Sequence, residues 1–183
     1  MAAEELLAAY ASLVRKWAPR LDLVSPGDLD RLEERHVQDS LRVVPLLDEL
    51  PAGPCADIGS GAGFPGVPLA IARPERRWTL IEPRRRRAAF LEEVVRELAL
   101  DALVVAKSAE LCAEDDDLRG RHVLATARAV REPVHVEPLA DPLLRPGGVT
   151  LVFKGEADLE RLPEHAEEWA PGLIIMRKPF EAC

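Results

Sequence analysis

Apolar residues recur at helical spacing through the first part of the chain. They predict a helix over residues 2–17, with apolar side chains at Leu6, Leu7, Tyr10, Leu13, Val14 and Trp17. Pro19 and the Ser25–Gly27 segment end this pattern. A second helix is predicted to begin at Asp28, a residue type that caps helices, and to continue to Val44. The stiff link Pro51–Pro54 follows, so we expect a helical extension over residues 1–50 and a second domain over residues 51–183.

From Cys55 onward, short apolar runs alternate with helical patterns. The runs predict strands at Cys55–Ile58, Trp78–Ile81, Ala102–Ala106, His122–Thr126, Val149–Phe153 and Leu173–Met176. The helices expected between them are Val67–Ala72, Arg84–Leu98, Pro133–Leu144 and Asp158–Trp169. Such alternation predicts an α/β fold of the Rossmann-like type, with a doubly wound, mostly parallel sheet.

Composition narrows the class of protein. The 183 residues are 48 % apolar and 31 % charged, which is typical of a globular domain. No apolar run approaches the roughly 20 residues of a membrane helix. The acidic N-terminus does not resemble a secretory signal, and the three cysteines lack the spacing of a disulfide framework or zinc site. We therefore expect a cytoplasmic, metal-free monomer that does not contact membranes.

The segment from Asp57 to Gly66 reads DIGSGAGFPG, and it lies between a predicted strand and a predicted helix. Its glycines permit a tight turn and close approach of a ligand to the backbone. The spacing Gly61-x-Gly63-x-x-Gly66 would also suit a nicotinamide oxidoreductase. However, Asp57 would repel a pyrophosphate and attract a cationic amino-acid ligand, and Glu82 ends the next strand where an acid reaches ribose hydroxyls. The pattern therefore favours S-adenosylmethionine (SAM) as cofactor, over NAD and over a glycine turn without a ligand.

Five segments carry a more specific signal. They are Arg35–Leu41 (RHVQDSL), Asp57–Ile71 (DIGSGAGFPGVPLAI), Arg87–Leu91 (RAAFL), Thr126–Ala129 (TARA) and Phe153–Gly155 (FKG). On these motifs, which occur in order between about Trp17 and Trp169, the sequence resembles the bacterial 16S ribosomal RNA guanine-N7 methyltransferases, also called glucose-inhibited division protein B.

The resemblance implies a class I SAM-dependent methyltransferase with an N-terminal helical extension, acting on 16S rRNA or the small ribosomal subunit. It also implies cofactor contacts at Gly59, Phe64, Ala109, Glu110 and Arg128. The physical interpretation of the loop adds Asp57, Gly61, Gly63 and Glu82 to this set.

Guanine N7 has an in-plane lone pair and no proton, so methylation there requires positioning and exclusion of water more than a general base. The candidate catalytic residues are Arg128, Lys154, His36 and Asp39. His36 and Asp39 share a helical face, and they could pair with each other, face the cofactor cleft or simply dock the helix. Arg128 ends a predicted strand at the ligand-binding edge of the sheet, where a plain salt bridge is the alternative. Lys154 is a candidate contact to RNA phosphate or to the guanine edge.

The formal net charge of −8 argues at first against a nucleic-acid partner. Between Arg73 and Arg87, however, seven arginines accompany only two acids. Arg84, Arg85 and Arg86 begin a predicted helix, where positive charge is unfavourable unless it serves another purpose. Because phosphate attraction depends on the local field, we expect these arginines, with Lys154, to contact RNA.

Two departures from the family pattern leave alternatives open. The family's asparagine-containing segment is replaced by Trp17–Ser25, which has no asparagine. Only one strand, Leu173–Met176, is predicted after the fifth, so we expect a shortened C-terminal end instead of the family's helix and two-stranded hairpin. The alternatives are a catalytically weak cofactor- and RNA-binding assembly protein, and a small-molecule methyltransferase.

Overall fold

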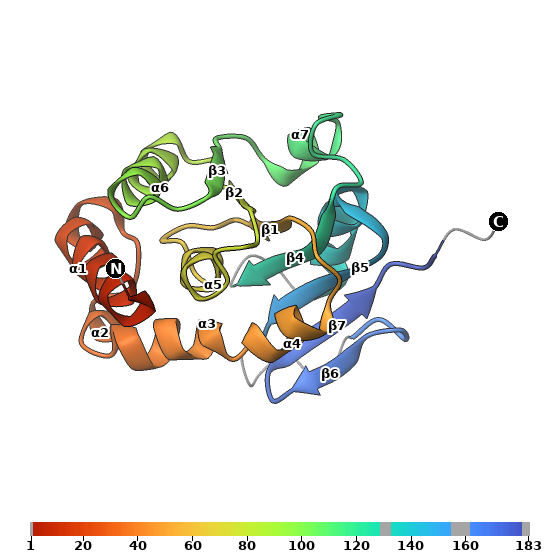
Figure 1. Ribbon diagram of the computed structural model, residues 1–183, viewed down its shortest axis with the longest axis horizontal. Helices are drawn as coiled ribbons and strands as arrows, with labels where there is room; N and C mark the ends of the chain where they lie inside the picture. The colour runs from red at the N-terminus through yellow and green to blue at the C-terminus, as the bar shows by residue number, and fades with distance from the viewer. Residues whose placement is uncertain (1, 129–132, 155–161, 181–183) are drawn as a thin grey trace.

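A single seven-stranded sheet organises the part of the chain that the computed structural model describes, residues 2–128, 133–154 and 162–180 (Figure 1). The strand order is β3-β2-β1-β4-β5-β7-β6. The first five strands are parallel, β7 is antiparallel to β5, and β6 is antiparallel to β7. The bounds are β1 Cys55–Ile58, β2 Trp78–Ile81, β3 Ala102–Val105, β4 His122–Arg128, β5 Leu144–Phe153, β6 Glu167–Ala170 and β7 Leu173–Arg177. The predicted doubly wound, mostly parallel α/β sheet is confirmed.

Both faces of the sheet are covered, and this explains the continuous apolar runs in the sequence. Along β1, Cys55 belongs to one hydrophobic cluster, with residues of α1, α5 and α6, whereas Ala56 and Ile58 belong to a second cluster with α7 and α8. Every residue of β1 and β2 is buried. Strands buried on both faces lack polar alternation, so β1 and β2 begin and end where predicted.

The helices fall into an N-terminal group and a group that connects the strands. The first group comprises α1 Ala3–Leu21, α2 Pro26–Leu29, the π-helix η1 Glu33–Gln38, α3 Asp39–Leu41 and α4 Val44–Glu49. The second comprises α5 Gly66–Ala72, α6 Arg85–Glu97, α7 Ala109–Ala113, α8 Pro133–Ala140 and the 3₁₀ helix η2 Asp141–Leu143. No helix among the described residues is long and apolar enough to cross a membrane.

Two predictions about the N-terminal helices were wrong. The first helix continues through Pro19 to Leu21, because Ala18 is buried and Leu21 packs against the core, which holds the last turn in place. The predicted helix from Asp28 to Val44 is divided among α2, η1, α3 and α4. Its apolar spacing predicted helical structure but carried no signal for the π-helical turn.

Two predictions about the C-terminal part were also wrong. The helix expected from Pro133 ends at Ala140, and after η2 the chain enters β5 at Leu144. The helix expected over Asp158–Trp169 is contradicted at its end, where Glu167–Ala170 forms β6, while its residues 158–161 lie outside the described part. Residues 167–170 adopt a strand because they pair with β7, a contact that their own sequence does not reveal.

The β6–β7 pair also corrects the expectation of a single C-terminal strand. Glu168 lies opposite Ile174, and Ala170 lies opposite Leu173. Gly172, in the turn between them, has φ +72°, a conformation that favours glycine. A two-stranded antiparallel hairpin, β6 and β7, therefore follows β5 in the described part of the chain.

The N-terminal group packs against the helices of the sheet's first face. Figure 1 shows α1 beside α6, and the side chains of Tyr10 and Val14 are fully buried in a cluster that includes Val67 of α5 and Leu91 of α6. Arg76, just before β2, reaches back and donates to the carbonyls of Leu47, Leu50 and Pro51 at 2.6–3.0 Å. Residues of both predicted domains thus share one hydrophobic core.

Candidate cofactor and substrate site

The glycine-rich loop follows β1 at the centre of the sheet. β1 lies between β2 and β4, where the strand order reverses, and in open α/β sheets ligands bind at this position beyond the carboxyl ends of the strands. Gly59, Gly61 and Gly63 have φ of 68°, 57° and 105°, so each adopts a conformation that residues with a Cβ rarely take. The loop therefore requires glycine at these positions, which supports its prediction as a cofactor loop.

Asp57 holds this loop from within the protein. Its carboxylate is fully buried, and it accepts hydrogen bonds from Thr126 Oγ1 at 2.8 Å and from the Gly66 amide at 3.4 Å. Burial raises the pKa of Asp57 to about 6, although these hydrogen bonds favour the ionised form. The carboxylate thus ties β1 to β4 and to the start of α5. Its predicted contact with a cofactor stays a prediction.

Glu82 holds the opposite side of the loop. One carboxylate oxygen accepts from the Gly61 amide at 2.9 Å, and the other accepts from the Arg84 amide at 2.8 Å. A carboxylate has about four acceptor positions, so two remain for the ribose hydroxyls that the sequence assigned to it. Glu82 therefore orients the glycine loop and retains the capacity expected of a cofactor ligand.

The ring of Phe64 lies behind the loop, between two residues of the N-terminal helices. Its centroid is 5.3 Å from that of Tyr10 and 5.0 Å from that of His36, with which it stacks at 25°. Tyr10 also donates its hydroxyl to the Ala62 carbonyl at 2.8 Å. Only 7 % of Phe64 is exposed, so its ring supports the loop, and the contact implied by the resemblance would be made by its backbone.

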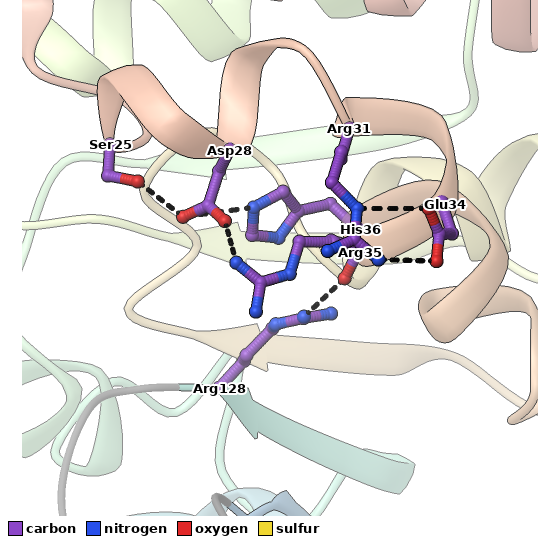
Figure 2. A network of polar contacts seen from close by, with 7 residues as sticks. All are labelled: Ser25, Asp28, Arg31, Glu34, Arg35, His36 and Arg128. Atoms are coloured by element: carbon purple, nitrogen blue, oxygen red, sulfur yellow. Dashed lines mark hydrogen bonds and ion pairs between the residues drawn. The ribbon is translucent and has the colours of Figure 1, made fainter.

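His36 belongs to a polar network centred on Asp28 (Figure 2). Asp28 accepts hydrogen bonds from Ser25 and Arg35, each at 2.6 Å, and these contacts lower the pKa of its carboxyl. His36 Nε2 lies 3.9 Å from the Asp28 carboxylate, and neither ring nitrogen of His36 has a hydrogen-bond partner among the described residues. Burial lowers the pKa of His36, and the charge of Arg128 lowers it further. The ring is therefore neutral near pH 7, and its pairing with Asp39, one of the alternatives considered, does not occur.

Arg128 extends from the end of β4 to the π-helix of the N-terminal group (Figure 2). It donates through Nη2 to the Arg35 carbonyl at 2.8 Å, and Nη1 lies 3.0 Å from an Asp39 carboxylate oxygen. The guanidinium also lies 5.1 Å from the Phe153 ring centroid, and burial lowers the pKa of Arg128. The salt bridge that was the alternative interpretation is thus present, and it fixes the position of this arginine over the cleft edge of the sheet.

Lys154 follows β5 and lies one strand away from Arg128, because Arg128 is in register with Phe153. The buried Nζ of Lys154 makes no hydrogen bond with the described residues, whereas Arg128 Nη1 is paired with the Asp39 carboxylate. Buried cationic groups without hydrogen-bond acceptors are costly. The Lys154 ammonium group therefore fits a ligand that brings an oxygen or nitrogen acceptor to the edge of the sheet.

The remaining predicted contacts follow β3. Ala109 is buried at the start of α7, a helix absent from the sequence predictions, and Glu110 is exposed in its first turn. Among the described residues, no cluster of three histidine, cysteine or acidic side chains could hold a metal ion. Cys55 and Cys112 are free and buried, and burial raises the pKa of Cys55 to about 12.

Sequence reasoning missed Tyr10 and Asp28 as parts of this site. Tyr10 was predicted only as an apolar position of the first helix, and Asp28 only as a helix cap. Their partners Ala62 and His36 come from other elements of the fold. The one available signal for Tyr10 was its hydroxyl, since a buried tyrosine usually needs a hydrogen-bond acceptor.

Comparison with known structures defines the fold. A methyltransferase from Geobacter sulfurreducens matches 96 % of this chain and 88 % of its own, with a TM-score of 0.63 and 13 % sequence identity. The similarity extends over nearly the whole sheet and its helices. The fold is that of a class I methyltransferase, as predicted.

Sequence comparison identifies the family. The family described as rRNA small subunit methyltransferase G matches residues 3–175, and the chain belongs to it. A ribosomal RNA small subunit methyltransferase G from Acidiphilium cryptum is 42 % identical over 165 residues, covering 89 % of this chain and 73 % of the relative. The protein of the same name from Mycobacterium leprae is 43 % identical over 156 residues, covering 85 % of this chain and 62 % of the relative. The predicted family is confirmed, for a chain that spans 62–73 % of the lengths of these relatives.

Proposed function

We propose that this chain transfers a methyl group from SAM to N7 of a guanine in 16S rRNA, either in free RNA or in the small ribosomal subunit. Family membership supports the reaction class. The observation that carries the proposal is the glycine loop, which Asp57 and Glu82 hold at the switch point of the sheet, close to the strand ends that bear Arg128 and Lys154. We expect the chain to act as a cytoplasmic monomer.

The residues of the loop fit SAM. Glycines at positions 59 and 61 leave no side chains between the loop backbone and a ligand, whereas Gly63 allows the loop to pack closely against Val67 and the Tyr10 hydroxyl. Glu82 retains acceptor positions for ribose hydroxyls, and Ala109 with Glu110 would contact the adenine side from α7. The cofactor would supply a sulfonium methyl group, which is an electrophile. The negative charge of the Asp57 carboxylate, on the other side of the loop, would stabilise the positive charge of the sulfonium.

The reaction needs positioning more than proton transfer, because N7 attacks through its own lone pair. Arg128, which the Arg35 carbonyl and Asp39 hold in position, would orient an acceptor group at the cleft. Lys154 would bind O6 of the guanine or a neighbouring phosphate, which would give its buried ammonium group a partner. His36 would act through Phe64, because its neutral ring stacks on the loop.

The test is mass-spectrometric mapping of N7-methylguanosine in 16S rRNA from a strain that lacks this gene. Complementation with the wild-type chain should restore the modification. Arg128→Ala should reduce it more than tenfold, about 1.4 kcal/mol or more in transition-state stabilisation. The matched control is Arg96→Ala, which removes an arginine that is 72 % exposed and paired only with Glu97 among the described residues.

A wild-type chain that binds SAM and RNA but adds no methyl group to rRNA would overturn the proposal and favour the assembly-protein alternative. Methyl transfer to small phenols or amines with no response to RNA would overturn it in favour of the small-molecule alternative.

A further inference from the structure

A charged groove runs between the end of α1 and the first turn of α6, which lie side by side in Figure 1. Its volume is about 360 Å³, and it is lined by Arg20, Leu21, Asp22, Arg84, Arg85, Arg86 and Arg87. Five arginines thus face a single aspartate, on a chain whose formal net charge is −8. We call this feature the arginine groove.

Two of the arginines hold the groove together. Arg86 Nη2 donates to the Arg20 carbonyl at 3.3 Å, and Arg87 Nη2 donates to the Asp22 carbonyl. The Arg87 side chain is only 19 % exposed, and it also lies 3.8 Å from the Asp22 carboxylate. These contacts satisfy the carbonyl groups that α1 leaves unpaired at its C-terminal end. Arg86 and Arg87 therefore dock the N-terminal helices onto α6.

The other arginines are not used in this way. Arg84 and Arg85 are exposed, and their guanidinium groups form no ion pair with the described residues. Arg20 is exposed as well, and its guanidinium lies over Trp17, 5.7 Å from the ring centroid. The first turn of α6 contains no acidic residue that would reduce the repulsion among these cations. A cluster of unpaired guanidinium groups in a groove indicates an anionic partner.

The position of the groove favours one anionic partner. Glu82 accepts from the amides of both Gly61 and Arg84, so the groove begins two residues from a side chain that holds the cofactor loop. A Cβ placed on Gly61 would lie 3.9 Å from Arg87 Nη1, which places the lining of the groove directly against that loop. An extended polyanion bound in the groove would therefore continue toward the cleft. Guanidinium forks match the geometry of phosphate oxygens.

We infer that Arg20, Arg84 and Arg85 bind backbone phosphates of the RNA strand that carries the target guanine, and that the groove places the neighbouring nucleotide at the glycine loop. This inference rests on the proposed function, since it assumes that RNA is the substrate. It adds to that function an anchoring surface formed jointly by the N-terminal helices and by α6. The groove binds phosphates and does not discriminate bases.

The experiment compares the wild-type chain with Arg84→Gln/Arg85→Gln and with Arg20→Gln. The matched control is Arg96→Gln, which removes one positive charge from the last turn of the same helix. Binding to a 16S rRNA fragment is measured over a range of salt concentrations, together with SAM affinity and the rate of methyl transfer. Because the substituted side chains are exposed, thermal unfolding should show that all variants remain folded.

We expect the groove variants to lose about 0.7–0.9 in the slope of log K against log salt for each phosphate contact removed. The KM for RNA should rise about tenfold near physiological salt, while SAM affinity and kcat at saturating RNA stay within about twofold. Arg96→Gln should behave like the wild type. If the wild-type chain methylates RNA and the groove variants show the same salt slope and the same KM as the wild type, the inference is overturned. A wild-type chain that transfers no methyl group to RNA would instead overturn the proposed function, whatever the slopes.

Discussion

Removal of the Tyr10 hydroxyl should destabilise the glycine loop, because it removes a hydrogen bond to the loop backbone. The Tyr10 side chain is fully buried, and its hydroxyl donates to the Ala62 carbonyl at 2.8 Å. Burial raises the pKa of Tyr10 well above its usual value, so the hydroxyl remains a donor throughout the neutral range. Tyr10→Phe removes this donor and keeps the aromatic ring, whose contact with Phe64 is 5.3 Å between centroids.

The expected cost follows from the carbonyl that loses its partner. A buried acceptor without a hydrogen bond costs about 1–3 kcal/mol, and a chain of this length loses roughly 2–4 °C in Tm for each kcal/mol. Tyr10→Phe should therefore lower the Tm by about 2–12 °C. Tyr10→Ala also removes the ring, so its cost should reach about 3–5 kcal/mol. The difference between the variants separates the hydrogen bond from the packing.

Thermal unfolding and calorimetric titration with SAM provide the two measurements. Because the hydroxyl contacts the loop itself, Tyr10→Phe should also weaken SAM binding by about 2- to 10-fold, up to 1.4 kcal/mol. The control is Ser12→Ala on the same helix, where an exposed hydroxyl donates to the Ala8 carbonyl at 2.9 Å, and its effect should stay within about 0.5 kcal/mol. Identical behaviour of Tyr10→Phe and Ser12→Ala in both assays would refute the reasoning.

Three further substitutions test other contacts of the site. The pKa of Asp57 is about 6 in the folded protein against an ordinary value of 3.8, so its contribution to stability is full below pH 4 and is lost, by roughly 3 kcal/mol, as pH rises through 6. A plot of the free energy of unfolding in urea against pH should therefore be flatter for Asp57→Asn over this window, and parallel plots for the two proteins would contradict this. Arg76→Met leaves three carbonyls unpaired and should cost about 2–4 kcal/mol in the same assay, whereas the exposed Arg77→Met should cost under about 0.5 kcal/mol; equal midpoints would exclude the bridging role. Gly63→Ala should lower both Tm and SAM affinity, because its Cβ would lie 2.7 Å from Val67 and 2.9 Å from the Tyr10 hydroxyl. The control is Gly120→Ala, which is also at positive φ but has open space around it and therefore measures the backbone strain alone. An equal effect of the two substitutions would show that the contacts of the added Cβ do not matter.

The sheet could be predicted wherever burial alone determines the structure. The bounds of β1 and β2 are correct because helices cover both faces, so each strand is a short, mostly apolar segment whose one polar residue, Asp57 or Thr79, is also buried. The same reasoning failed at Glu167–Ala170, since an exposed pair of glutamates beside Trp169 suits a helix until β7 provides hydrogen-bond partners. Pro19 misled for a related reason, because tertiary contacts of the last turn of α1 outweigh the loss of one backbone hydrogen bond.

The sequence identified residues of the candidate site but not the hydrogen bonds and ring contacts that join them. Asp57 and Glu82 were identified as acids beside the loop, yet their hydrogen bonds to Thr126 and Gly61 join residues 69 and 21 positions apart. No local pattern encodes such pairs. His36 illustrates the limit most clearly, since its stacking on Phe64 depends on how the π-helix docks against the loop.

The position of β7 between β5 and β6 has a consequence for synthesis of the chain. Translation produces β6 before β7, yet the described pairing of β6 is to β7 alone, so β6 must wait for a strand that has not yet been made. Until Leu173–Arg177 leaves the ribosome, the apolar residues Val149–Phe153 of β5 form an open edge, which is a surface prone to aggregation. A nonsense mutation just before Leu173 should therefore produce an insoluble polypeptide, even though the glycine loop and its acids have all been translated.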